Sequence, residues 1–313
     1  MNKKVAGIVA AAAVILVGGV YFLTGNNTSK NNTNKVEVRE ITHKLGTTKI
    51  EGKPEKTVVL DYGTLDALDT LGVEVTGLPK SGKLPSYLSK FKDDSYANTG
   101  SVKEPDLEAI HALKPDVIFM AGRMADYYDE LSEIAPTVYI ESDGANYIES
   151  FSKSMEIYGQ IFNKEDKAKE LVKEVTEKAE EVKAKTSGLN ASVVMVNGRS
   201  ISAFGKDSRY GLIFNELGFG MSDTTLKDST HGQEVSFEYF IEKNPEYIFV
   251  IDRNSITGSS EGSASDVLEN ELVKQTNAYK NGKIVYLDSI VWYTVSGGYT
   301  STLNMIDEVN KAL

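Results

Sequence analysis

Cysteine is absent from this sequence of 313 residues, and histidine occurs only three times. Without a thiol the chain can form no disulfide bond, bind no iron–sulfur cluster and use no cysteine nucleophile. Three scattered histidines are also too few for a manganese or zinc site, which draws its ligands from several imidazoles and carboxylates. We interpret two of them, His43 and His111, as structural residues.

Positive charge is scarce as well. The sequence has 34 Lys and Arg against 45 Asp and Glu, a formal net charge of −11 and a pI near 5.0. Nucleic acids are excluded as partners, because binding a phosphate backbone needs a basic surface. Any anionic ligand must therefore be met by a local cluster of basic side chains.

Enzyme motifs are missing too. The sequence contains no Gly-x-Ser-x-Gly elbow, no Gly-x-Gly-x-x-Gly turn and no Walker loop. We therefore predict that the protein is not an enzyme.

The chain starts with a basic residue pair and an apolar run from Val5 to Leu23 that contains no charge. Residues 1–25 are predicted to be an export signal or a single membrane anchor, and the length of the run does not separate the two. Both interpretations place the rest of the chain outside the cytoplasm, tethered to the outer face of a bacterial cytoplasmic membrane or in a periplasm.

A polar stretch follows the apolar run. Residues 26–35 cannot bury a core and are predicted to be a flexible tether. Leu23-Thr24-Gly25 resembles the end of a bacterial lipoprotein signal, but Asn26 stands where such a signal has its acylated cysteine. Lipidation is therefore impossible in this sequence.

From residue 36 onward, short apolar runs alternate with segments of helical spacing. Residues 57–60 predict a strand, and Leu65, Leu68 and Leu71 predict a helix that stops at Gly72. Residues 107–113 predict a second helix, followed by a buried strand at 117–120. This alternation is typical of parallel α/β sheets, and the 41% hydrophobic content is enough for two packed lobes.

One long amphipathic helix is predicted between the two halves. Charges recur on every turn from Asn163 to Lys185, with Asn163 as a plausible N-cap and Gly188 as a stop. About twenty helical residues extend roughly 30 Å. We predict a Rossmann-like N-terminal lobe over 36–162, a linker helix over 163–187 and a Rossmann-like C-terminal lobe over 188–313, each lobe with a parallel sheet.

The segment 237–253 repeats the segment 107–123. The positions that match are Glu108/Glu238, Pro115/Pro245, Ile118/Ile248, Phe119/Phe249 and Arg123/Arg253. Any helix–turn–strand unit explains the proline and the apolar residues, but not the arginine at both strand ends. Ligands of parallel sheets bind beyond the carboxyl ends of the strands, so Arg123 and Arg253 are expected to face one cleft between the lobes.

Four segments give the sequence a family resemblance. They are 104–116 (EPDLEAIHALKPD), 201–211 (ISAFGKDSRYG), 243–253 (KNPEYIFVIDR) and Trp292-Tyr293. With these segments the chain resembles the solute-binding proteins of ABC iron–siderophore importers, in particular those for catecholates such as enterobactin and petrobactin. The family's class III fold has two α/β lobes rigidly joined by one long helix, with the ligand between them.

The resemblance also implies roles for single residues. Arg123, Arg209 and Arg253 correspond to the basic triad that holds a ferric catecholate, with Trp292 beside it. His231 and Tyr293 correspond to a pair that binds Fe(III) directly when a tetradentate siderophore leaves two positions open. The matched glutamates, Glu108 and Glu238, correspond to carboxylates that dock on basic residues of the permease. The resemblance further implies a monomer with no permanently bound cofactor.

The chemistry suits these residue types. A ferric tris-catecholate carries a net charge of about −3, and the guanidinium of arginine offers permanently charged, forked donors to paired oxygens. A tyrosine phenolate and an imidazole nitrogen can complete an iron coordination sphere.

Several alternatives remain open at this stage. A second interpretation makes Arg209 a cap for a helix that begins near Tyr210 and puts Arg199 in its place in the cleft. Tyr293 is one of sixteen tyrosines and His231 lies in a loop, so either residue could be purely structural. The same fold could also carry haem, with Tyr293 as an axial ligand, or another ferric siderophore.

Overall fold

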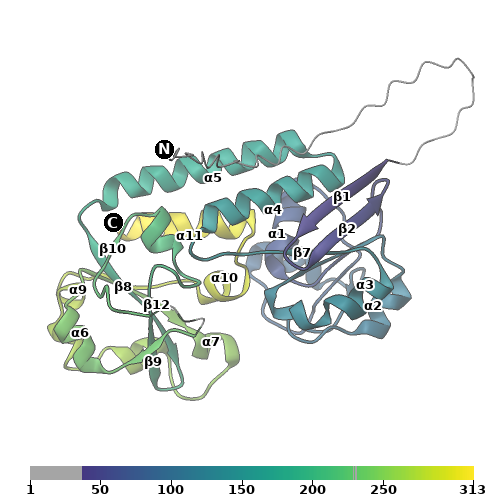
Figure 1. Ribbon diagram of the computed structural model, residues 1–313. Coiled ribbons are helices and arrows are strands. Elements are labelled where there is room, and N and C mark those ends of the chain that lie inside the picture. The colour runs from purple at the N-terminus through teal and green to yellow at the C-terminus, as the bar shows by residue number, and fades with distance from the viewer. Residues whose placement is uncertain (1–36, 228, 230) are drawn as a thin grey trace, which may run out of the picture. The chain divides into compact units, whose positions relative to one another are not determined.

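The structure is a computed structural model that describes residues 37–227, 229 and 231–313 of the chain. These residues form one compact unit with two large β-sheets, each covered by helices, and a separate two-stranded sheet (Figure 1). The predicted export segment 1–25 and tether 26–35 lie outside the described residues.

The first sheet has five strands, all parallel, in the order β5-β4-β3-β6-β7. Its strands are β3 (Thr57–Val59), β4 (Gly77–Leu78), β5 (Ala97–Asn98), β6 (Val117–Ala121) and β7 (Thr137–Ile140). The helices between them are α1 (Tyr62–Leu71), η1 (Ser86–Lys92), α2 (Leu107–Leu113), η2 (Gly122–Tyr127) and α3 (Tyr128–Ile134). The predicted strands and helices of this lobe are confirmed, including the stop of α1 at Gly72, which has a φ of 71°.

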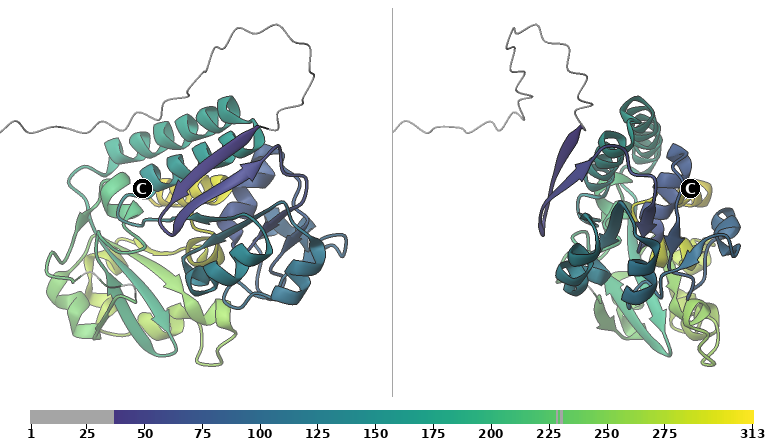
Figure 2. Two further views of the ribbon diagram at one scale, coloured as in Figure 1. Left: turned by 45° about the vertical axis from the view of Figure 1, so that its right-hand side comes forward. Right: turned by 90° about the vertical axis from the view of Figure 1, so that its right-hand side faces the viewer.

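A hairpin precedes this sheet. Strands β1 (Val38–His43) and β2 (Gly46–Glu51) pair only with each other, antiparallel. The hairpin packs on the edge strand β7, and Figure 2 shows it on the outer side of the lobe. Thr48 fastens it there, because its hydroxyl donates a hydrogen bond to the carbonyl of Thr137 in β7.

The second sheet is mixed, which corrects the prediction of a parallel sheet. Its order is β11-β9-β8-β12-β13, with the short strand β10 beside β8. The strands are β8 (Asn190–Asn197), β9 (Ser200–Phe204), β10 (Gly220–Met221), β11 (Gln233–Val235), β12 (Tyr247–Asp252) and β13 (Ile284–Tyr286). Strands β9 and β11 run antiparallel to their neighbours. The cause is a two-residue turn, Gly198-Arg199, whose glycine has the positive φ that a tight hairpin requires.

Helices of this second lobe surround the sheet. They are η3 (Leu212–Glu216), α6 (Phe237–Lys243), α7 (Arg253–Thr257), α8 (Ala264–Leu268), η4 (Val273–Gln275), α9 (Asn277–Lys280) and α10 (Ser289–Thr294). Of these, α6 leads into β12 and α7 leaves it, which reproduces the arrangement of α2, β6 and η2 in the first lobe.

Two long helices follow each other between the sheets, and the second corresponds to the predicted linker helix over 163–187. Helix α4 (Tyr147–Phe162) ends at Asn163, and α5 (Glu165–Thr186) begins after Lys164. Asn163 was predicted to begin the linker helix, but its φ of 56° makes it the left-handed C-cap of α4. Helix α5 runs beside both α4 and α11 (Tyr299–Ala312), as Figure 1 shows.

The C-terminal helix α11 returns to the first lobe. It packs on α1, and the buried carboxylate of Asp66 in α1 accepts hydrogen bonds from the backbone N–H groups of Thr300 (3.2 Å) and Ser301 (2.7 Å). Those N–H groups have no partner inside the helix, so Asp66 supplies the N-terminal cap from a distant segment.

Candidate functional site

The repeat positions two of the three predicted arginines. Helices α2 and α6 both end in a left-handed residue, Lys114 (φ 52°) and Asn244 (φ 39°), and turn into β6 and β12. Arg123 is the second residue after β6 and lies in η2, and Arg253 directly follows β12. Each arginine therefore lies at the carboxyl end of a central strand of its own sheet, as the sequence predicts.

Tyr293 in α10 is the residue on which the arginines converge. Nη2 of Arg123 and Nη2 of Arg209 both donate to its backbone carbonyl, at 2.9 and 2.8 Å. Nε of Arg253 lies 3.3 Å from its phenol oxygen. The guanidinium carbons of Arg123, Arg209 and Arg253 lie 5.4, 4.5 and 5.9 Å from the centre of its ring, within the range of cation–π attraction. The structure thus brings together four of the predicted residues.

The arginines are held by uncharged acceptors. Within residues 37–227, 229 and 231–313, none of the three forms an ion pair with a carboxylate. Besides Tyr293, the acceptor is the side-chain oxygen of Asn197, 2.6 Å from Nη1 of Arg253. Three positive charges therefore stay uncompensated by direct contact, in a protein whose net charge is negative. Such a cluster favours an anion that can take hydrogen bonds.

The charges change the acidity of the phenol. Burial alone would raise the pKa of Tyr293, but the hydrogen bond from Arg253 and the charge of the three arginines outweigh it, so the pKa lies below its ordinary value of 10.0. Burial, followed by the charge of Arg209, lowers the pKa of Arg123 below its ordinary value. Its guanidinium nevertheless stays protonated at neutral pH, because an arginine loses its proton only in strong base.

A cavity of about 430 Å³ opens beside the cluster. Arg123, Arg209 and Tyr293 line it, together with Asp61, which the sequence analysis did not single out. The carboxylate of Asp61 caps α1 by accepting bonds from the N–H and hydroxyl of Thr64, both at 2.7 Å. Burial raises the pKa of Asp61 although those bonds and the charge of Arg123 oppose it.

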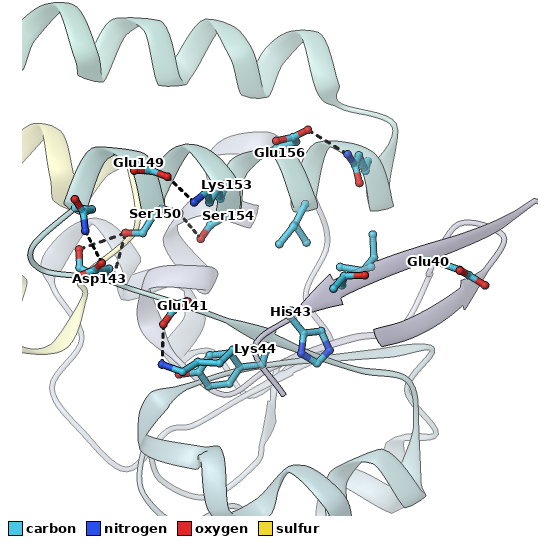
Figure 3. A pocket seen from close by; sticks show the side chains of 16 residues that line it. Glu40, His43, Lys44, Glu141, Asp143, Glu149, Ser150, Lys153, Ser154 and Glu156 are labelled. Carbon is cyan, nitrogen blue, oxygen red and sulfur yellow. Dashed lines mark hydrogen bonds and ion pairs between the residues drawn. The ribbon is translucent and has the colours of Figure 1, made fainter. Parts of the chain in front are cut away.

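A second cavity, of about 410 Å³, lies between β1, the end of β7 and α4 (Figure 3). Its lining has no arginine, and its lysines face carboxylates: Lys44 pairs with Glu141 and Lys153 with Glu149. His43 lines it, and burial lowers the pKa of this imidazole. The basic cluster therefore does not extend into this second cavity.

His231 is not part of the cluster. It is exposed on the loop before β11, and its backbone N–H lies 3.3 Å from the hydroxyl of Ser229. Within the described part of the chain, it neither lines the cavity beside Tyr293 nor bonds to Tyr293. Its neighbours Asp228 and Thr230 lie outside the described residues.

The structure corrects the predicted place of Trp292. It was predicted beside the ligand, but its side chain is only 3% exposed and lies in the core. Its indole N–H donates to Glu308 of α11 at 2.8 Å, and Glu308 also accepts the backbone N–H of Asp288, which begins α10. Successive residues of an α-helix lie about 100° apart around its axis, so Trp292 can face the core while Tyr293 faces the arginines.

The remaining predicted positions are at the surface. Glu108 and Glu238 are exposed in the first turns of α2 and α6. Arg199 is exposed in the turn between β8 and β9, and among the described residues it makes no hydrogen bond to Tyr293. Arg209 lies in a turn and bonds to Tyr293 rather than capping a helix. The alternative that exchanged these two arginines is therefore wrong.

The sequence analysis missed Asn197 and Glu308. Asn197 ends β8 beside Arg253, and the Asn-Gly pair at 197–198 is a local signal for a hairpin at that strand end. Nothing local marks Glu308, whose partners are distant in the sequence.

The family of the chain follows from comparison with known proteins. Residues 57–291 match the family model described as periplasmic binding protein. The chain belongs to this family. It is accordingly a substrate-binding protein with two α/β lobes.

Three relatives of this periplasmic binding protein are similar over most of their length. The petrobactin-binding protein YclQ of Bacillus subtilis (strain 168) is 46% identical over 294 residues, 92% of each chain. Its crystal structure matches with a TM-score of 0.85 over 88% of this chain and 98% of YclQ. The catecholate-siderophore-binding protein VctP of Vibrio cholerae is 36% identical, with a TM-score of 0.84 over 88% of this chain and all of VctP. The ferric-anguibactin-binding protein FatB of Vibrio anguillarum is 36% identical over 278 residues, 87% of this chain and 86% of FatB.

No helix among the described residues of this family member is long and apolar enough to cross a membrane.

Proposed function

We propose that the chain is the extracytoplasmic receptor of an ABC iron importer and that it binds a ferric catecholate siderophore between its lobes. The observation that carries this proposal is the cluster of three arginines around Tyr293, drawn from both lobes and held by neutral acceptors. The ligands named for YclQ, VctP and FatB point to the same class of cargo.

The cluster suits a multiply charged oxygen anion. A ferric tris-catecholate has a charge of about −3 and presents oxygens on its rim, which forked guanidinium donors can contact in pairs. Arg123 and Arg209 each donate one hydrogen bond to the carbonyl of Tyr293, and their remaining N–H groups would donate to ligand oxygens. A hydroxamate complex is often nearly neutral and would leave this charge unmatched.

Tyr293 is also proposed as an iron ligand for tetradentate siderophores. Its lowered pKa favours the phenolate, which is a hard oxygen donor suited to Fe(III). His231 would supply the second ligand after its loop moves toward the cleft.

Delivery to the permease is proposed to use Glu108 and Glu238. Each residue lies at the start of a helix that runs antiparallel to the strand it precedes, so its helix N-terminus lies at the same sheet edge as the arginine. Both carboxylates are exposed there, one per lobe, and can meet basic residues of a partner. We further propose that the receptor is a monomer, catalyses no reaction and holds the siderophore as its only, reversibly bound, non-protein group. The segment 1–25 would attach it to the membrane or export it.

The test is a titration of residues 36–313, the compact unit, followed by quenching of tyrosine and tryptophan fluorescence. Ferric bis-catecholate and tris-catecholate complexes are the ligands, with haemin and ferric hydroxamate as comparisons. We expect saturable catecholate binding that the double substitution Arg123→Ala/Arg253→Ala weakens about 100-fold or more, because it removes two charge-assisted contacts.

Arg199→Ala is the matched control, since this arginine is exposed outside the cluster and its loss should leave binding unchanged. Binding of haemin alone would transfer the proposal to haem, with Tyr293 as axial ligand. Equal binding by the double variant would remove the cleft from the mechanism.

A further inference from the structure

Asn197 lies next to Arg253 and holds it with an uncharged oxygen. We propose that Asn197 is a positioning residue that fixes Arg253 for the anionic ligand while leaving its charge available. The role toward the ligand rests on the proposed function; the role toward Arg253 and Tyr293 does not.

The sheet register creates the contact. Asp252 at the end of β12 is paired with Val196 of β8, so the next residues, Arg253 and Asn197, face each other where the strands end. Oδ1 of Asn197 lies 2.6 Å from Nη1 of Arg253. On the other side of the guanidinium, Nε lies 3.3 Å from the phenol oxygen of Tyr293. Two contacts at different nitrogens fix the plane of the guanidinium, and Nη2 remains for a ligand.

The backbone that carries Asn197 is itself fixed. Asn254, which is 2% exposed, accepts the N–H of Gly198 at 2.6 Å and donates to the carbonyl of Gly198 at 3.0 Å. This pair of bonds ties the turn after Asn197 to the start of α7, where Arg253 lies. The acceptor and the arginine therefore belong to one rigid assembly, as a preorganised site requires.

The side-chain amide of Asn197 suits this position better than a carboxylate or a methyl group would. An aspartate at this position would hold the same guanidinium more strongly but would cancel its charge and repel the anion. An alanine would leave the guanidinium free to rotate, at a loss of its orientation toward the phenol. Asparagine gives orientation without neutralisation.

Two variants separate these effects, Asn197→Ala and Asn197→Asp. Asn281→Asp is the matched control, because it adds the same charge at an exposed asparagine that ends α9. Circular dichroism and thermal melts first establish that every variant is folded. The probes are the ferric tris-catecholate complex and the alkaline titration of Tyr293, isolated as the difference between each protein and the same protein with Tyr293→Phe.

We expect Asn197→Ala to weaken binding about tenfold and to move the Tyr293 titration to higher pH, because Arg253 no longer faces the phenol steadily. Asn197→Asp should weaken binding by a further factor of about ten, raise the phenol titration more and reduce the salt dependence of binding. Asn281→Asp should resemble the wild type in both measurements.

An unchanged Tyr293 titration in Asn197→Ala overturns the proposal, whatever happens to binding. A shifted titration with unchanged binding overturns it as well, since Asn197 would then not serve the ligand. If the wild type binds no catecholate, the proposed function has failed, and the titration alone decides whether Asn197 positions Arg253.

Discussion

Tyr293 meets the arginines with three different groups. Its backbone carbonyl accepts hydrogen bonds from Arg123 and Arg209, and its phenol oxygen accepts one from Arg253. Its ring lies near all three guanidinium groups. A main-chain carbonyl persists in any substitution, so the first contact does not depend on the side chain. The phenol does, and the substitution Tyr293→Phe isolates what it contributes.

The lowered pKa of Tyr293 makes a prediction about pH. We expect the phenol to titrate below 10.0 in the wild type and to move upward in Arg253→Ala, because its hydrogen bond and the adjacent charge are removed. A phenol whose pKa is depressed on folding contributes stability that is present above the unfolded pKa and is lost as pH falls through the folded pKa. The stability advantage over Tyr293→Phe should therefore grow as pH rises toward 10.

Absorbance near 295 nm, taken as a difference between wild type and Tyr293→Phe, measures the titration. Arg199→Ala serves as the control arginine, with no expected shift. A phenol that titrates at or above 10.0 in the wild type would mean that burial, not the arginines, dominates at this residue.

At the scale of elements, the contact between α1 and α11 joins the first α-helix of the described chain to the last. Asp66 caps α11 across 235 sequence positions, and Gly298 before this helix leaves no room for a side chain, since an added Cβ would overlap Oδ2 of Asp66. Burial raises the pKa of Asp66 although the hydrogen bonds of Thr300 and Ser301 oppose the rise. The carboxylate thus stays in the core because α11 supplies its donors.

We predict that Asp66→Ala lowers the free energy of unfolding by about 2 to 4 kcal/mol. The substitution removes the helix cap and leaves two backbone N–H groups without an acceptor in a buried site. Urea denaturation measures the change. Asp126→Ala, at an exposed position of η2, is the control and should alter stability by less than about 0.5 kcal/mol. A similar small effect for Asp66→Ala would show that solvent or another acceptor replaces the cap.

The fold and the site were predictable from the sequence where the signals are local, and not where residues distant in the sequence meet. The helices and strands of the repeat, and the arginines at their ends, are predictable because hydrophobic period and turn residues are local signals. The reversal of β9 was missed although Gly198 marks it locally. The hydrogen bond from Trp292 to Glu308 and the capping of α11 by Asp66 join separate segments, and no hydrophobic periodicity or short motif encodes such contacts.

At the scale of the whole molecule, the two sheets share one hydrophobic cluster, and each sheet has a further cluster of its own. A single cluster of buried side chains contains Phe119 of β6, Val175 of α5, Phe249 of β12 and Ile306 of α11. Tyr147 of α4 adds polar contacts, because its phenol oxygen lies 3.0 Å from the hydroxyl of Thr302 and accepts the N–H of Gly297 at 2.9 Å. The predicted boundaries at 163 and 188 therefore divide the sheets but not the shared hydrophobic cluster.

A continuous core predicts that both lobes unfold together. In urea, the fluorescence of Trp292, which reports on α10, and far-UV circular dichroism, which reports on all helices and strands, should give coincident transitions. A bound ferric catecholate should move both by the same amount, since a ligand held between the lobes stabilises only the state in which both are folded. Two separate transitions would show that the lobes are independent and that α4, α5 and α11 do not transmit stability between them.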